Sequence, residues 1–467
     1  MLKMKSNLDY SKILKTTIII LTFLVLVLSI VRIMDHDEIE HIHSAWYIKE
    51  GKIPYKDFFQ SHNPLFWYLM APFVAIYESP NIIFFFRFLM FLSILAIAYF
   101  TKKIVEEITD SKEVSYITII LLLTNLAFLH KAIEIRPDVP QTLTSIISIW
   151  LMIKYFKTRN NKLLILSGIV LAISFLFLQK AIALFLAIIL FLIYLKIVNK
   201  ELKLKQTLIF SVSFLLPIIF FLGYMIFVGA LNDYIIGSWL VNLFFALSFS
   251  PLNNIGFFAK NFFVWALMIL GLIEIINGKE KNFYLKFLYF VLFILLLTTF
   301  FTKTPFLQYF MTAMVIISII GAYFLAKLYN SFKVKEIYKI IVLFLIISYP
   351  LGNIVWSLQK TNFAEIERFE FIKENTTKED YFFGNGNKMN LFSQDVHYIW
   401  FGANSNSNLG TYNKITNGKF SDYNSCKLIE EKKPKFVYWI KTKENNCDIR
   451  GLGFEETKYE NLYMRKD

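Results

Sequence analysis

The sequence is poor in charge. Only 18% of its 467 residues are charged, whereas 56% are hydrophobic and the mean hydropathy is +0.51. A soluble protein of this size could not bury so much apolar surface, so a soluble globular fold is excluded. The 50 Phe and 25 Tyr fit a lipid-packed bundle with aromatic rings at its interfaces. Composition therefore predicts an all-α polytopic membrane protein.

The first apolar run lacks a small-residue cleavage site. Residues 13–33 follow a Lys-rich start, and about 20 residues suffice to cross a hydrocarbon core of about 30 Å. We therefore expect a retained span and not a signal peptide. The same criterion predicts about eleven transmembrane helices, at residues 13–33, 81–101, 114–130, 139–156, 163–178, 181–198, 207–228, 257–276, 285–302, 306–326 and 337–357.

Positive charge is scarce in alternate loops between these spans. Lys and Arg fill the even-numbered loops, and the short odd-numbered loops have few. The positive-inside rule then predicts a multi-pass protein of the plasma membrane with a cytoplasmic N-terminus. Residues 34–80 and the C-terminal tail would lie outside. The net charge of +14 thus reflects membrane topology, which argues against a nucleic-acid partner.

Two domains follow from this pattern. Residues 1–358 would form the transmembrane domain, whose first outer loop (34–80) carries interfacial helices, among them an apolar stretch at 65–77 that is too short to cross. Residues 359–467 would form a small extracytoplasmic α/β domain. Its predicted elements are a helix at 365–374, strands at 381–383, 435–440 and 462–464, and a turn at 384–387. The nearly uncharged segment 229–256 is expected to be a lid-like loop.

Cysteine is almost absent. Cys426 and Cys447 flank the clearest strand of the tail. Outside the cell a disulfide is permitted. Two unpaired thiols are about equally compatible with the sequence.

Acids and histidines gather directly after the first span, in the segment Asp-His-Asp-Glu-Ile-Glu-His-Ile-His at 35–43. If residues 37–49 are helical, Asp37, His41 and Ser44 share one face. A carboxylate there could act as a general base towards a hydroxyl group. The alternative is that the acids cap the start of a helix and favour its positive dipole end. That alternative explains one or two acids better than four.

Further charges lie at the outer ends of later spans. Asp138 follows Arg136 and Pro137, and Pro137 suits the first turn of the fourth span. Lys180 and Lys303 stand at two other outer ends. Each Lys could simply extend its amine to the interface. Together, such cations suit a lipid phosphate.

The first outer loop resembles that of the GT-C superfamily of membrane glycosyltransferases. The resemblance rests on Asp37-Glu38, Gly51, Pro54 to Phe59, and His62 to Leu65. Three later segments are also similar to the family: Glu134 to Asp138, Gly168 to Lys180, and Lys303 to Pro305 with Gln308-Tyr309. At Gln308-Tyr309 relatives often carry His-Tyr. The likeness covers about residues 10–330 in all. Within the superfamily, the sequence more nearly resembles a bacterial and archaeal branch that includes lipopolysaccharide galacturonosyltransferases. It resembles aminoarabinose transferases of lipid A and protein O-mannosyltransferases more distantly.

The resemblance implies transfer of a sugar from a polyprenyl-phosphate donor to a lipid, glycan or protein acceptor outside the cytoplasm, with inversion. It makes Asp37 the general base. Glu38, His41 and Asp138 would complete the acceptor site, and Arg136, Lys180 and Lys303 would bind the lipid phosphate. Some relatives use a divalent metal, for which Asp37, Glu38, His41, His43 and Asp138 could supply ligands. Their spacing is no tight metal signature, so no metal is assigned.

Two other functions share some of these features. A flippase or transporter for lipid-linked glycans would place charges and broken helices near the bilayer midplane. Here the ionisable residues gather at one face, and no transporter-type repeat is found. A polymerase or ligase for cell-surface polysaccharides would share the outer-face geometry and stays open.

Overall fold

The computed structural model describes residues 9–199, 203–246, 258–259, 261–301, 306–384, 390–400, 408–440 and 447–466. The chain folds into two compact units, each built from three separate stretches of sequence. Unit 1 comprises Met1–Arg32, Arg87–Ile219 and Leu247–Lys360; unit 2 comprises Ile33–Phe86, Phe220–Ala246 and Thr361–Asp467. The predicted boundary at residue 358 remains a prediction, while the unit that contains the tail also contains the first outer loop.

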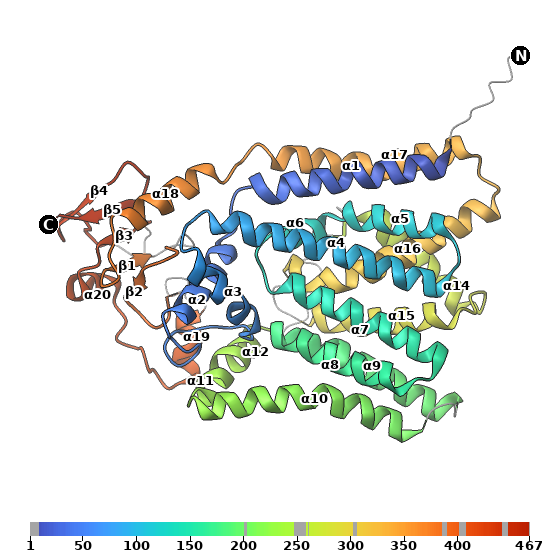
Figure 1. Ribbon diagram of the computed structural model, residues 1–467, viewed down its shortest axis with the longest axis horizontal. Helices are drawn as coiled ribbons and strands as arrows, with labels where there is room; N and C mark the ends of the chain where they lie inside the picture. Colours follow the sequence, from blue (N-terminus) through green and yellow to red (C-terminus); the bar gives the residue numbers. More distant parts are fainter. Residues whose placement is uncertain are drawn as a thin grey trace, which may run out of the picture. The chain divides into compact units, whose positions relative to one another are not determined.

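The chain is mostly helical (Figure 1). Up to the tail, the helices are α1 (Tyr10–Val31), α2 (His36–Lys49), α3 (Leu65–Ile76), α4 (Ile82–Ile108), α5 (Lys112–Leu123), α6 (Leu126–Ala132), α7 (Asp138–Thr158), α8 (Asn161–Phe177), η1 (Gln179–Ala181), α9 (Ile182–Tyr194), η2 (Leu195–Asn199), α10 (Leu204–Phe227), α11 (Leu231–Tyr234), η3 (Ile235–Leu240), α12 (Val241–Ala246), α14 (Phe262–Ile276), α15 (Phe283–Phe300), η5 (Leu307–Phe310), α16 (Met311–Ser331) and α17 (Glu336–Ser357).

Unit 1 is a helical bundle around α16. In the stretch Leu307–Ser331, 89% of the residues of its most apolar 18-residue window are buried, as expected for a helix that is apolar on all sides. By contrast, only 17% of the residues in the corresponding windows of α10 and α17 are buried, and their apolar faces suit contact with lipid. α7 packs along α8, and α1 lies beside α17 (Figure 1).

Each of the eleven predicted spans overlaps a helix or helix pair. Among the described residues, seven helices are long and apolar enough to cross a membrane. The pair α5 and α6, which bends by 65°, could add an eighth. α8 and α14 are shorter apolar helices, so the count of eleven is not confirmed.

Unit 2 joins the first outer loop to a small α/β fold. The interfacial helix predicted at 65–77 is α3, with 12 residues. The segment predicted as a lid-like loop at 229–256 is instead helical over 231–246, as α11, η3 and α12; its remainder, 247–256, lies outside the described residues. The tail contributes α18 (Phe363–Glu374), β1 (Tyr381–Gly384), β2 (Gln394–Asp395), α19 (Asn408–Ile415), α20 (Ser425–Lys432), β3 (Phe436–Tyr438), β4 (Phe454–Glu456) and β5 (Leu462–Arg465).

The five strands form one mixed sheet in the order β2-β1-β3-β5-β4. β1 pairs in parallel with β2 and β3, while β5 pairs antiparallel with β3 and β4. The core includes Phe383, Val437 and Trp439. Cys426 and Cys447 form a disulfide beside this core. The helix and the three strands predicted in the tail are confirmed, whereas most of the predicted turn at 384–387 lies outside the described residues.

Candidate active site

The start of α2 uses two of its acids as a cap. The Asp35 carboxylate accepts a hydrogen bond from the Asp37 amide at 3.1 Å. The Glu38 carboxylate in turn accepts one from the Asp35 amide at 2.9 Å, which completes a capping box. Glu38 is fully buried. The helix-capping alternative therefore accounts for Asp35 and Glu38.

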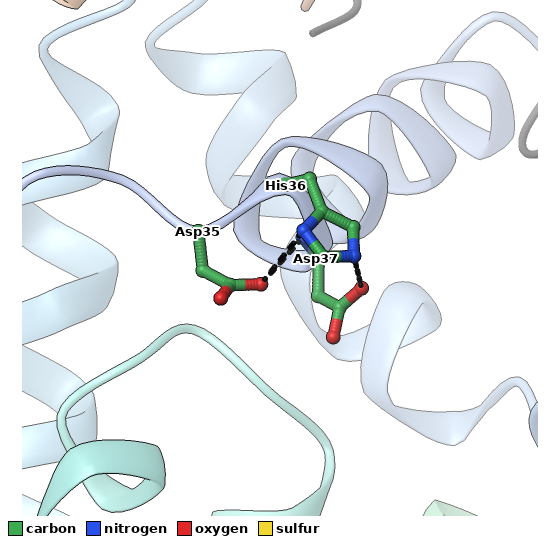
Figure 2. A group of neighbouring side chains, drawn as sticks. All are labelled: Asp35, His36 and Asp37. Carbon is green, nitrogen blue, oxygen red and sulfur yellow. Dashed lines mark hydrogen bonds and ion pairs between the residues drawn. The ribbon is translucent and has the colours of Figure 1, made fainter. Parts of the chain in front are cut away.

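Asp37 is placed differently. Its carboxylate lies 3.1 Å from Nε2 of His36, whose Nδ1 lies 3.4 Å from Asp35 (Figure 2). The Asp37 side chain is 18% exposed. The hydrogen bond with Asp37 raises the pKa of the His36 imidazole above its ordinary value, although burial opposes that shift. Asp37 thus presents a partly exposed carboxylate beside an imidazole, and its role as general base remains a prediction.

The other two histidines of α2 are buried in unit 2. His41 is 1% exposed, and its Nδ1 accepts a hydrogen bond from the Trp67 indole at 3.0 Å. His43 is fully buried and contacts Leu391 and Asp395 of the tail. The predicted face of Asp37, His41 and Ser44 does exist on α2, but His41 and Ser44 are packed against neighbouring segments. Their part in acceptor binding remains a prediction.

The ligands suggested for a metal are mostly engaged elsewhere. Glu38 caps α2, and both His41 and His43 use ring nitrogens in hydrogen bonds. Within the described part of the chain, Asp35, His36 and Asp37 have donor atoms within 4.8 Å of one another (Figure 2). One imidazole and two carboxylates fit a divalent cation with mixed nitrogen and oxygen ligands. His36 was not singled out in the sequence, although its position between two Asp was a usable signal.

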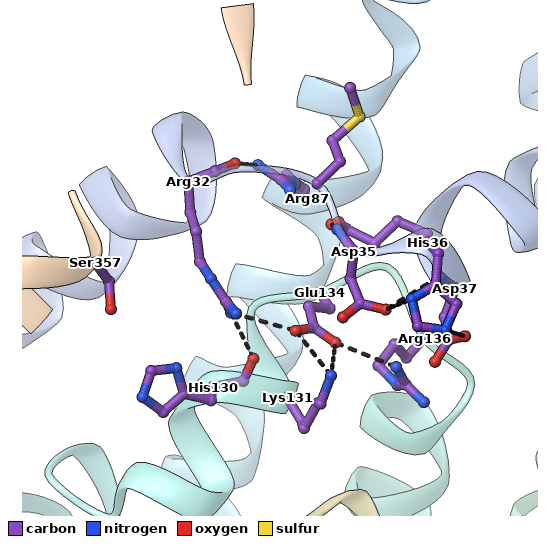
Figure 3. A network of polar contacts seen from close by, with 12 residues as sticks. Arg32, Asp35, His36, Asp37, Arg87, His130, Lys131, Glu134, Arg136 and Ser357 are labelled. Atoms are coloured by element: carbon purple, nitrogen blue, oxygen red, sulfur yellow. Dashed lines mark hydrogen bonds and ion pairs between the residues drawn. The ribbon is translucent and has the colours of Figure 1, made fainter. Parts of the chain in front are cut away.

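Unit 1 gathers charges around Glu134. Its carboxylate accepts hydrogen bonds from Arg32 at 3.2 Å, Lys131 at 2.8 Å and Arg136 at 3.2 Å (Figure 3). Glu134 and Arg136 are each 2% exposed. A buried carboxylate needs such partners because an unpaired charge is costly to desolvate.

The same cluster continues to the start of α7. Nε of Arg136 lies 3.4 Å from the Asp138 carboxylate, which also pairs with Lys180. Nζ of Lys180 donates to the Gln308 carbonyl at 2.8 Å. The cluster therefore contains four cations and two carboxylates: Arg32, Lys131, Arg136, Lys180, Glu134 and Asp138.

Local sequence explains why these residues meet. The chain bends after α5 because Asn125 starts a new helix: its side chain accepts a hydrogen bond from the Phe128 amide at 3.1 Å and so caps α6. The resulting bend directs α6 and the segment after it, up to Asp138 at the first turn of α7. Lys180 lies in the short turn η1 between α8 and α9.

The structure brings Arg136, Asp138 and Lys180 into one cluster, as the sequence suggested. Asp37, Glu38 and His41 lie together on α2 of unit 2. Lys303 lies outside the described residues. Arg32 and Lys131 were not predicted as site residues. The spacing of Lys131 and Glu134, three apart near a helix end, was the available signal.

Part of the chain matches the sequence model of a known protein family. Residues 61–227 match the sequence model of the dolichyl-phosphate-mannose-protein mannosyltransferase family. That range contains Arg136, Asp138 and Lys180 but not Asp37. No significant match is found among curated proteins.

Two solved structures share the fold. ArnT from Cupriavidus metallidurans, solved with undecaprenyl phosphate, matches with a TM-score of 0.52 and 10% identity over 68% of this chain. The chain spans 60% of ArnT. The oligosaccharyltransferase AglB from Archaeoglobus fulgidus, solved with an inhibitory peptide and a dolichol-phosphate, matches with a TM-score of 0.52 and 10% identity. That match covers 91% of this chain and 69% of AglB. The chain therefore has the fold of ArnT and AglB, and part of it matches the mannosyltransferase family model, in line with the resemblance noted in the sequence.

Proposed function

We propose, with the GT-C fold as the premise, that this protein is an integral-membrane glycosyltransferase. It moves a sugar from a polyprenyl-phosphate donor to a hydroxyl group of a lipid, glycan or protein acceptor. The chain crosses the plasma membrane about eleven times, with a cytoplasmic N-terminus. The first outer loop and the tail lie outside, so transfer takes place on the outer face.

One observation carries this proposal: the charge cluster at the outer end of α7. Its six side chains carry four positive and two negative charges, and they include the buried Arg136 and the partly exposed Lys180. Arg donates paired hydrogen bonds to phosphate, and Lys adds a compact charge. A lipid phosphate is therefore the ligand that this cluster favours. Lys303 is the third proposed phosphate-binding residue.

The chemistry needs a base more than an acid. The acceptor hydroxyl gives its proton to Asp37, and its oxygen attacks the anomeric carbon. The bond from that carbon to the phosphate oxygen breaks, and the electron pair leaves with the lipid phosphate. A phosphate leaving group is a weak base, so nearby cations suffice to stabilise it. Attack from the face opposite the leaving group inverts the configuration. Asp138 pairs with Arg136 and Lys180. Glu38 and His41, which the resemblance assigns to the acceptor site, are buried and hydrogen-bonded within unit 2.

The test replaces Lys180 by an uncharged side chain of similar length. Lys180→Met is expected to raise the KM for a polyprenyl-phosphate-linked sugar about tenfold or more, since a hydrogen bond to a charged group contributes about 1.5–3 kcal/mol. The matched control is Lys102→Met, at a solvent-accessible Lys near the C-terminal end of α4. The measurement is steady-state transfer by purified protein in detergent, with a panel of lipid-linked sugars. An unchanged KM in Lys180→Met would contradict the assignment of the phosphate site.

A further inference from the structure

Helix α2 is held on two faces within unit 2. On one face His41 accepts from Trp67 of α3 at 3.0 Å, and Ser44 accepts from Gln60 at 2.6 Å. On another face His43 and Tyr47 contact Asp395, which belongs to β2 of the tail. In the sequence, Asp395 follows His43 by 352 positions and Tyr47 by 348 positions.

The contacts of Asp395 form a closed network. Its carboxylate Oδ2 lies 2.7 Å from Nε2 of His43 and accepts from the Tyr47 hydroxyl at 2.8 Å. The Tyr47 oxygen accepts in return from the Asp395 amide at 2.9 Å. Every polar atom in this exchange has a partner with suitable geometry.

Both ring nitrogens of His43 have partners. Its Nδ1 lies 3.0 Å from the Leu391 carbonyl, which can only accept, so Nδ1 is the donor of that hydrogen bond. Its Nε2 lies 2.7 Å from Oδ2 of Asp395. With His43 fully buried and Asp395 8% exposed, water competes little for this contact.

Geometry links this network to the proposed base. His43 is six residues after Asp37, which places it about 120° around α2 and about 9 Å along its axis. The network therefore does not touch the reacting atoms, but it fixes both the rotation and the position of the helix that carries Asp37. β2 pairs with β1, so Asp395 is itself held by the sheet of the tail.

We propose that Asp395 of the tail, with His43 and Tyr47, is a set of positioning residues that holds α2 in the orientation required for transfer. The proposal rests on the proposed function, because positioning matters only if Asp37 acts in the reaction. On this proposal, the role of the tail is to hold α2, the helix that carries Asp37.

The experiment compares Asp395→Asn with Asp422→Asn, a conservative change at an exposed aspartate of the same tail. Activity is measured per folded molecule, after size-exclusion chromatography. Asp395→Asn is expected to lower kcat on the order of tenfold to a hundredfold, the cost of a small misplacement of a reacting group. The KM for the lipid-linked donor is expected to stay unchanged, because the charge cluster of unit 1 is intact. Tyr47→Phe, which removes both hydrogen bonds of the Tyr47 hydroxyl and keeps the contact between His43 and Asp395, is expected to give a smaller loss of kcat.

Hydrogen exchange supplies a second readout that does not need activity. Amides of residues 39–47 are expected to exchange faster in Asp395→Asn and Tyr47→Phe than in wild type, while those of α16 do not change. Wild-type kcat per folded molecule in Asp395→Asn would overturn the proposal. If the wild type transfers no sugar from any lipid-linked donor, the proposed function fails, and exchange then decides alone: unchanged protection of residues 39–47 overturns the positioning proposal.

Discussion

At the scale of single residues, neighbouring acids have different tasks because they meet different partners. Asp35 and Glu38 exchange hydrogen bonds with backbone amides at the start of α2. Asp37 lies between them in the sequence. It contacts the His36 imidazole, as Asp35 also does, and both of these aspartates are partly exposed. Protonation of a capping carboxylate would weaken its hydrogen bond to the helix start, which favours Asp37 over Asp35 and Glu38 as the base. The catalytic role of Asp37 remains a prediction.

A pH effect is expected from His397 of the tail. Burial lowers the pKa of its imidazole, and its Nδ1 accepts a hydrogen bond from the Ile399 amide at 3.0 Å. In the unfolded chain the pKa is about 6.5. The unfolded state therefore binds more protons below that pH, so the stability contributed by neutral His397 is lost as the pH falls.

The measurement is the midpoint of thermal unfolding between pH 7.5 and pH 5. We expect the wild type to lose more stability on acidification than His397→Asn, in which the side chain still accepts a hydrogen bond but cannot be charged. Equal losses in the two proteins would show that His397 does not contribute to the pH dependence.

At the scale of elements, the disulfide between Cys426 and Cys447 ties α20 to the segment before β4. The cysteines are 21 residues apart in the sequence, and closing a loop of that length stabilises the folded state by about 3 kcal/mol in the chain-entropy model. The double variant Cys426→Ser, Cys447→Ser is expected to unfold at a lower temperature. A reductant should lower the unfolding temperature of the wild type and leave the variant unchanged.

The same cysteines also test whether the tail lies outside the cytoplasm. Disulfides persist in oxidising compartments, so protein taken directly from cells should resist thiol labelling until it is reduced. Labelling without reduction would contradict the placement of the tail outside the cytoplasm.

Much of the element pattern was predictable, because apolar length alone marks a membrane helix. The run 114–130 predicted one span but not its bend: the structure has two helices there, α5 and α6, because Asn125 caps the second one, and the pair could still be one broken span. The helical segment 231–246 was also missed, since its Asn, Ser and Gly favour loops by composition. Strands β2 and β4 have only two and three residues, too few to show an alternating pattern.

At the scale of the whole molecule, each unit is assembled from segments far apart in the chain. The cluster of unit 1 brings together Arg32, Arg136 and Lys180, and unit 2 brings His43 to Asp395. Sequence reasoning could name several of these residues by type and by their place at span ends. It could not pair His43 with Asp395, because nothing local links residues 352 positions apart.

The central claim is that Asp37 deprotonates the acceptor during sugar transfer. The most direct measurement is the rate of transfer from a polyprenyl-phosphate donor by Asp37→Asn, per folded molecule. Its matched control is Asp57→Asn, at an exposed aspartate of the same loop whose bond to the Ile53 amide an asparagine can keep. We predict that Asp37→Asn loses at least about a hundredfold in rate, the usual contribution of a general base, while Asp57→Asn transfers like the wild type. Transfer at the wild-type rate by Asp37→Asn would contradict the account.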